Sequence, residues 1–370
     1  MNIQDLLEKR KEIYNKVLMF IDNDDENDDE PIYNDLINFL ESFQITENIS
    51  EIRDFLVLMQ HIDGYHRINQ YFKIERILRF FFESIKKNFT CTEIFTIFGK
   101  NRRILQFLIK NEILLIDDSI IQLIYEYNPK KQYLYFASEL KKVMTADINK
   151  LIDEDLSSQG ENAFHNYEQN RQIGENDSYI CKLIREDSCV DFIQYINQSN
   201  LNLSIQIKES IFETNIYLIE NKPTLIEYAA FFGSIQIFQY LLLNNAEITK
   251  SLMHYAIHGR NPEIIHLIEE LHVVPEYNYK NCYEEAIKCH HNEIAAYFEN
   301  FIDLRQQTIK SFYFKYWNYS FFPNNLNDIY SISYLCEYGH STLVNFILQT
   351  TDIDINTKVL HTDDIFHLFI

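Results

Sequence analysis

The stretch Thr224–Leu241, TLIEYAAFFGSIQIFQYL, defines a spacing that the second half of the chain repeats. Small apolar residues come first, a turn containing Gly233 follows, and bulky aliphatic side chains complete the stretch. The same spacing returns in Ser251–Ile268, Asn281–Phe298 and Tyr330–Ile347. Two short amphipathic segments around a polar turn predict a helical hairpin. One hairpin cannot bury its own apolar face, so the sequence predicts that the hairpins stack.

Each copy carries a small or apolar residue eight positions before an aliphatic one. The pairs are Ala229 and Ile237, Ala256 and Ile264, Ala286 and Ile294, and Leu335 and Leu343. A weaker copy begins near Tyr179. The small residues let neighbouring helices approach closely, and the aliphatic residues fill the space between hairpins. Alternation of the strand type is not sustained anywhere, so we expect an all-α fold.

The unit resembles the ankyrin repeat, whose pattern is T-P-L-H-x-A-A-x-x-G-H. Thr224, Ala229 and Gly233 match that pattern, and Ser251 and His254 match its Thr and His in the next copy. The copies start at 224, 251 and 281, which are 27 and 30 residues apart. The usual ankyrin spacing is about 33 residues. The resemblance therefore implies an ankyrin-type solenoid with shortened loops between its hairpins.

A narrower resemblance rests on the run Ser210–Asn215, SIFETN, followed by the block at Thr224. This pair of segments is similar to the ankyrin proteins expanded in trichomonad protists. In those proteins a helical amino-terminal domain of unknown function accompanies the repeats. The resemblance implies a protein-binding module and implies no particular substrate.

The domain organisation follows from changes in pattern along the chain. Residues 1–156 carry amphipathic helix patterns and predict a helical amino-terminal domain. Residues 157–178 are polar, contain two of the seven glycines, and predict a linker or loop. Residues 179–370 predict a solenoid of about five to six degenerate units, the last one truncated. The chain stops in the apolar run 365–370, IFHLFI, without a polar capping repeat, so we expect self-association through this end.

Composition excludes several classes of partner. The chain of 370 residues has 33 Lys and Arg against 55 Asp and Glu, a net charge of −22. Nucleic acids and anionic membranes are bound through basic side chains, so we expect neither as a partner. The six cysteines include no C-x-x-C pair, and no stretch of 18 apolar residues occurs. We expect an intracellular, cytoplasmic protein in a reducing compartment.

The sequence contains only weak signals for metal-binding or catalytic residues. His254 and His258 are four residues apart on one predicted helix, but His254 occupies the structural His position of the ankyrin pattern. Cys282 and Cys289 are separated by six residues rather than by two to four, so we do not read them as a zinc cluster with His290 and His291. No G-x-S-x-G or P-loop pattern occurs. We expect no metal, no cofactor and no enzymatic activity.

The ankyrin resemblance places partner contacts at the end of each inner helix. The two positions after the paired alanines face the concave groove in ankyrin folds. In this sequence the partner-contact candidates at those positions are Phe231, Phe232, His258, Lys288, Glu337 and Tyr338. A competing interpretation is that at least one of the two phenylalanines packs between repeats.

The segment Phe312–Phe322, FYFKYWNYSFF, holds eight aromatic residues among eleven, including the only tryptophan. One interpretation is a degenerate repeat whose aromatic rings fill a core. The other is an exposed aromatic patch, with Tyr316 and Trp317 as partner contacts.

These observations favour a non-enzymatic protein–protein interaction scaffold that uses the concave face of an ankyrin solenoid. The alternative is an adaptor whose amino-terminal helical domain carries a separate targeting or recruitment activity. Both readings need another protein as partner, and the sequence leaves the identity of that protein and the biological process open.

Overall fold

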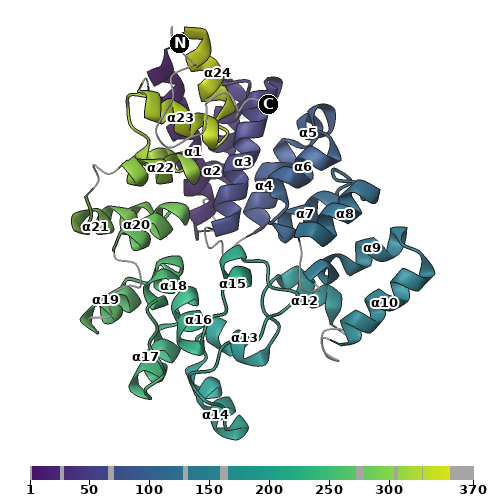
Figure 1. Ribbon diagram of the computed structural model, residues 1–370, viewed down its shortest axis with the longest axis vertical. Helices are drawn as coiled ribbons and strands as arrows, with labels where there is room; N and C mark the ends of the chain where they lie inside the picture. Colours follow the sequence, from purple (N-terminus) through teal and green to yellow (C-terminus); the bar gives the residue numbers. More distant parts are fainter. Residues whose placement is uncertain are drawn as a thin grey trace. The chain divides into compact units, whose positions relative to one another are not determined.

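A computed structural model describes residues 2–25, 29–65, 71–127, 132–158, 166–271, 279–303, 307–326 and 328–350 (Figure 1). Helices account for the regular structure of these residues, apart from one isolated antiparallel bridge between Gln206 and Thr224. The all-α prediction is confirmed. The chain forms two compact units, which are described separately. The first comprises Met1–Asp63, Ile68–Asn88 and Glu299–Ile370, and the second comprises Gly64–Arg67 and Phe89–Phe298.

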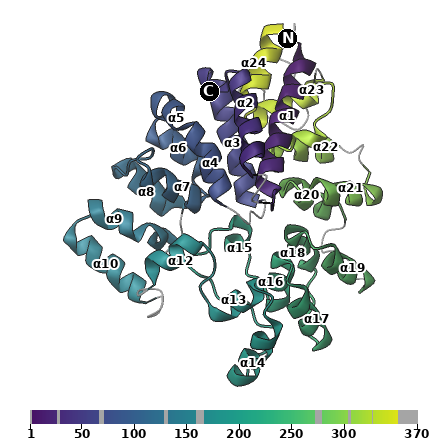
Figure 2. The same ribbon diagram turned by 180° about the vertical axis from the view of Figure 1, so that it is seen from behind.

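The first unit joins helices from the two ends of the chain. Figure 2 shows the amino-terminal helices in purple beside the carboxy-terminal ones in yellow. Within this unit α1 contacts α2, η4 and α24, and α23 contacts α22 and α24. The described helices are α1 (Ile3–Asp22), α2 (Asp29–Ser42), η1 (Ile45–Glu47), α3 (Ile49–Tyr65), α4 (Phe72–Phe80), α5 (Phe82–Asn88), η3 (Glu299–Phe301), α22 (Gln307–Lys315), η4 (Tyr319–Phe321), α23 (Ile329–Glu337) and α24 (Ser341–Thr350).

A buried carboxylate in α3 caps the amino end of α24. Asp54 accepts hydrogen bonds from the backbone amides of Ser341, at 3.2 Å, and Thr342, at 3.0 Å. A carboxylate stabilises this end of a helix because the first amides have no partner within the helix. Arg10 of α1 pairs with Glu51 at 2.6 Å and lies 3.8 Å from Asp54. The amino-terminal helices therefore cover the last described hairpin. We expect self-association through the apolar run 365–370, and that run lies outside the described residues.

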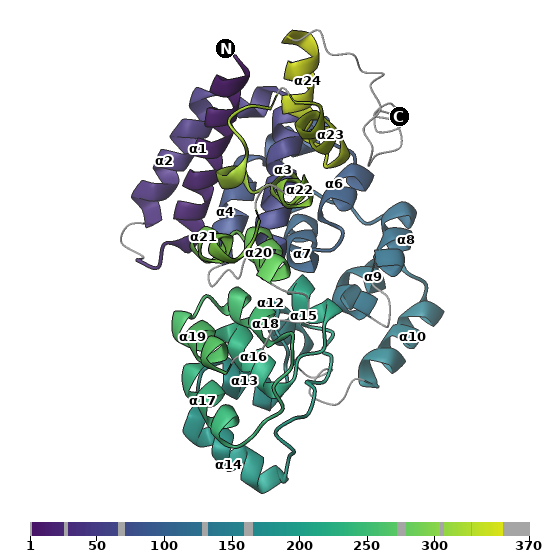
Figure 3. The same cartoon turned by 60° about the vertical axis from the view of Figure 1, so that its left-hand side comes forward.

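The second unit contains four helical hairpins whose first helices pack against one another in the order α13, α16, α18 and α20. Figure 3 shows these hairpins one above another. The helices of the unit are α6 (Cys91–Phe98), α7 (Arg102–Lys110), α8 (Asp118–Tyr127), η2 (Gln132–Phe136), α9 (Ala137–Val143), α10 (Ala146–Ser157), α12 (Tyr167–Ile173), α13 (Tyr179–Arg185), α14 (Cys189–Ser199), α15 (Ile216–Glu220), α16 (Leu225–Phe232), α17 (Ile235–Leu243), α18 (Leu252–Gly259), α19 (Pro262–Glu270), α20 (Tyr279–Lys288) and α21 (Asn292–Phe298). The small residues Ala229, Ala256 and Ala286 are fully buried, as close helix packing requires.

The turn inside each hairpin passes through one residue with left-handed backbone conformation. These residues are Asp187, Gly233, Arg260 and His290 in the second unit, and Trp317 and Gly339 in the first. The amide of each donates to the carbonyl three residues back, as from His290 to Ile287. The next amide reaches five residues back in most copies, as from His291 to Ala286. This is the Schellman pattern, which satisfies the last carbonyls of a helix.

In four of these six turns, the residue that follows the left-handed position also bonds to the preceding hairpin. Its side chain donates to a carbonyl at the end of the preceding inner helix. The bonds run from Ser234 to Ile184 at 2.5 Å, from Asn261 to Gly233 at 3.0 Å, from His291 Nδ1 to Ile257 at 2.8 Å, and from His340 Nε2 to Phe314 at 2.8 Å. Each bond fixes the register of one hairpin on the one before it.

The boundaries of the two compact units differ from those of the domains expected from the sequence, which are 1–156, 157–178 and 179–370. Residues 1–156 are shared between both units, because α1–α5 belong to the same unit as the carboxy-terminal helices, and α1 contacts α24. The second half of the expected linker forms α12 and is packed. The Tyr167 hydroxyl donates to the carbonyl of Leu134 at 2.7 Å, and Arg171 pairs with Glu139 at 2.5 Å. The polarity of this segment thus partly reflects buried hydrogen bonds.

The aromatic segment Phe312–Phe322 fills the core of the first unit. Trp317 is 1% exposed and stacks on His340 with ring centroids 3.9 Å apart. Tyr316 is 8% exposed. The exposed-patch interpretation is wrong for both residues, because α22, η4 and the following hairpin bury them.

We expect the fluorescence of Trp317 to resist quenching by iodide in the folded protein and to become quenchable on unfolding. Trp317 is the only tryptophan, so its signal needs no assignment. Its ring is buried, and a hydrated anion cannot reach it. Strong quenching under native conditions would restore the exposed-patch interpretation.

We expect Ala229→Asp to destabilise the second unit by about 3 kcal/mol or more, because it buries an unpaired charge between helices. Ala296→Asp is the matched control, since Ala296 of α21 is exposed. Amide hydrogen exchange should become faster together in α13, α16, α18 and α20. Faster exchange in α16 alone would contradict a core shared by the hairpins.

Candidate functional site

The ends of successive inner helices bring three of the predicted contact residues together. Phe231 of α16, His258 of α18 and Lys288 of α20 each stand two positions before the left-handed residue of their hairpin. The rings of Phe231 and His258 are 5.1 Å apart. Phe232, next to Phe231, is half-buried. Phe231, His258 and Lys288 therefore occupy equivalent positions in their hairpins.

Helix α15 covers this face. The ring of Tyr217 lies 4.2 Å from that of His258 and parallel to that of Phe231, at 6.3 Å. The Lys288 ammonium lies 5.3 Å from the centre of the Tyr217 ring. Phe231 is 1% exposed and His258 is fully buried. The expectation that these two residues face an open groove is wrong, because α15 occupies that groove.

The other contact candidates belong to the first unit. Glu337 is exposed and Tyr338 is half-buried at the end of α23, so both can be reached from solvent. Tyr316 and Trp317 are in the core of that unit. Of the eight candidates, Phe232, Lys288, Glu337 and Tyr338 keep some exposed surface.

A polar cluster lies under Tyr217. His258 Nε2 is 2.8 Å from Glu285 Oε1, and the Lys288 ammonium is 3.1 Å from the same oxygen. Cys289 Sγ is 3.4 Å from His258 Nδ1 and 3.5 Å from Nε2. Glu285 lies in the last turn of α20 and Cys289 directly follows that helix, with its amide bonded to the Glu285 carbonyl, so the two side chains lie on one side. One ligand atom from each of His258, Glu285 and Cys289 lies within 4.8 Å of the other two.

The surroundings define the charge state of this cluster. Burial acts to raise the pKa of Glu285, but attraction to Lys288 and the hydrogen bond from His258 hold that pKa at about 2. Burial lowers the pKa of His258, against the effect of Glu285. Burial, assisted by Glu285, raises the pKa of Cys289 well above its usual value. Near pH 7 the carboxylate is charged, the imidazole is neutral and the thiol keeps its proton.

The order acid, imidazole, thiol is that of a nucleophilic triad, but the environment does not suit nucleophilic catalysis. A cysteine nucleophile reacts as the thiolate and must reach its substrate. Cys289 is protonated near pH 7 and fully buried. The same three donor types are, however, those that bind zinc.

Sequence reasoning had not included Glu285 and Tyr217. The four-residue spacing of Glu285 and Cys289 on α20 was a local signal that could have been noticed. Tyr217 carries no such signal, because it lies outside the repeated pattern and its position depends on tertiary packing.

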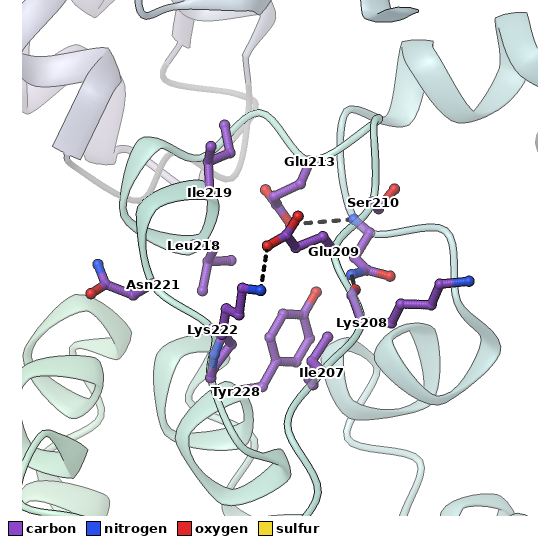
Figure 4. A pocket seen from close by; sticks show the side chains of 12 residues that line it. Ile207, Lys208, Glu209, Ser210, Glu213, Leu218, Ile219, Asn221, Lys222 and Tyr228 are labelled. Atoms are coloured by element: carbon purple, nitrogen blue, oxygen red, sulfur yellow. Dashed lines mark hydrogen bonds and ion pairs between the residues drawn. The ribbon is translucent and has the colours of Figure 1, made fainter. Parts of the chain in front are cut away.

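A small pocket beside α15 surrounds Glu213, Lys222 and Tyr228 (Figure 4). Glu209 and Lys222 form an ion pair of 2.8 Å at its edge. The pocket has room for about 20 Å³, enough for one water molecule. We therefore assign it a structural role.

Comparisons with known proteins give one match. Residues 243–324 match a family described as a domain of unknown function, DUF3447. This region includes α18 to α21, the polar cluster and Trp317. No curated protein and no solved structure matches the chain. Among the described helices, none is long and apolar enough to cross a membrane.

We expect Glu213→Gln to reduce the pH dependence of stability. Burial raises the pKa of Glu213 to about 7, against an ordinary value of 4.5. The folded protein therefore holds this proton more tightly than the unfolded chain does. The resulting stabilisation is present below pH 4.5 and is lost as the pH rises to 7. Between pH 5 and 8 the free energy of unfolding of the native protein should fall by about 2 kcal/mol more than that of the variant, as measured by urea unfolding.

Glu209→Gln is the control for this measurement. Glu209 lies at the edge of the same pocket and is exposed, so its substitution should leave the pH dependence nearly unchanged. A Glu213→Gln protein with the full native pH dependence would show that Glu213 is not the group responsible.

Proposed function

We propose that the protein is a non-enzymatic protein–protein interaction scaffold of the ankyrin-repeat type. The repeated sequence unit, the stacked hairpins and the side-chain bond from each turn to the preceding hairpin support this proposal. The family that matches residues 243–324 occurs in ankyrin-repeat proteins, which agrees with the same class. Stacked hairpins of this type present extended surfaces to other proteins.

The contact surface that we propose is the groove between α19 and α21. This groove has a volume of about 460 Å³, and it is the observation on which the proposed contact surface rests. Its apolar lining comes from Pro262, Ile265 and Ile294, and Tyr297 stands beside them with 41% of its surface exposed. The Tyr297 hydroxyl donates to Glu269 at 2.6 Å, which links the two helices. The inner face is less suitable, since α15 covers it.

The charges around the groove favour a basic partner. Glu269 and Glu293 line it, and the carboxylate of Glu293 is almost fully exposed. Arg260 is the only lining residue with a permanent positive charge. The chain as a whole has a net charge of −22. We therefore propose a protein segment that places apolar side chains in the groove and Lys or Arg at its rim.

Selection from a random peptide library on the purified protein tests this proposal. We expect enriched peptides that combine apolar residues with an excess of Lys and Arg. Their affinity should fall at least about tenfold in an Ile265→Ala, Tyr297→Ala variant, because the apolar contact is lost. Their binding should also weaken as the salt concentration rises.

Leu243→Ala is the matched control, since Leu243 of α17 is 81% exposed and outside the groove. It should bind the selected peptides like the native protein. Peptides that bind the groove variant as tightly as the native protein, or that are mainly acidic, would refute the groove as the contact surface.

A further inference from the structure

We propose that His258, Glu285 and Cys289 form a binding site for a divalent ion of the zinc type. His258 comes from α18, Glu285 from α20, and Cys289 from the residue directly after α20, so the site joins two neighbouring hairpins. Imidazole, carboxylate and thiolate are the ligands that zinc uses in proteins, and thiolate disfavours magnesium and calcium. The spacing of Cys282 and Cys289 predicts no zinc cluster, and the site proposed here pairs Cys289 with His258 and Glu285 instead.

The three ligand atoms are close enough to share one ion once the side chains of Cys289 and His258 reorient. Zinc–ligand bonds of about 2.0–2.3 Å at tetrahedral angles place a ligand nitrogen about 3.5 Å from a ligand sulfur. Cys289 Sγ is 3.5 Å from His258 Nε2 and 3.4 Å from Nδ1, so it lies over the face of the ring and must move towards the lone pair of Nε2 to share an ion with it. Nitrogen and oxygen ligands would be about 3.4 Å apart by the same reasoning. The present distance from Nε2 to Glu285 Oε1 is 2.8 Å, so that pair must open by a few tenths of an ångström.

The ion takes the place of the hydrogen that Nε2 shares with Glu285. The imidazole stays neutral, because its proton moves from Nε2 to Nδ1 and Nε2 then donates its electron pair to the ion. The Cys289 thiol releases its proton to solvent and binds as the thiolate. A water molecule completes four-coordination.

The charges of such a centre balance. A divalent ion with one thiolate and one carboxylate has no net charge, which suits a buried position. The Lys288 ammonium, 3.1 Å from Glu285, compensates the charge of that carboxylate. A bound divalent ion would compensate the same charge, so Lys288 would no longer be needed for this. About 14% of the Lys288 side chain is exposed, so the ammonium can turn towards solvent and open a path for the ion.

Titration of the reduced, untagged, metal-free protein with Co²⁺ tests the site. We expect one ion per chain, a thiolate-to-cobalt charge-transfer band, and loss of that band when Zn²⁺ is added. Mg²⁺ and Ca²⁺ should not displace cobalt. Cys289→Ser should abolish the band, and Glu285→Gln should weaken binding at least about tenfold.

Cys282→Ser is the matched control, because Cys282 is a buried thiol on the same helix and is outside the cluster. It should bind cobalt like the native protein. If Cys289→Ser does not fold, X-ray absorption on the native zinc complex should show one sulfur at about 2.3 Å. Absence of stoichiometric cobalt binding, equal loss of the band in Cys282→Ser, or a zinc shell without sulfur would overturn the proposal.

Discussion

The turn that ends each inner helix is the constraint on which the stacked hairpins depend. The chain reverses there through one left-handed residue, and in four copies the next side chain donates to the preceding hairpin, as His291 does to Ile257 and Ser234 does to Ile184. Carbonyls at a helix end have no partner within the helix, and burying them unpaired costs free energy. These four turns therefore close their own hairpins and also fix the position of each hairpin on its neighbour.

That register also places the candidate sites. Because α18 and α20 end at matching positions, His258 of one meets Glu285 and Cys289 of the other. The same alignment creates a continuous aromatic surface, which Tyr217 covers. The inner face, where an ankyrin resemblance places partner contacts, thus becomes interior. The outer groove with Ile265 and Tyr297 stays open to solvent.

The features predictable from the sequence are those encoded locally. Pairs such as Ala229 and Ile237 recur at a fixed spacing, and they identified the hairpins and the all-α class. Trp317 occupies the left-handed turn position of its copy. The sequence does not indicate this turn, because the segment is aromatic and has no glycine there. The packing of α1 on α24 and the covering of His258 by Tyr217 join residues far apart in sequence. The spacing of residues along the sequence does not predict such long-range contacts. For this reason the sequence predicts an exposed position for the contact candidates Phe231, His258, Tyr316 and Trp317, which are buried in the structure.

The most direct test of the turn constraint is the protonation state of two histidines, measured by long-range ¹H–¹⁵N correlation NMR. A carbonyl only accepts, so His291 must carry its proton on Nδ1 and His340 on Nε2 to make the observed bonds. Burial lowers the pKa of His340 to about 3, so its ring should stay neutral at pH 5. We expect these two different tautomers, each with a slowly exchanging ring proton. A shared tautomer with fast exchange, or titration of His340 near pH 6.5, would contradict it.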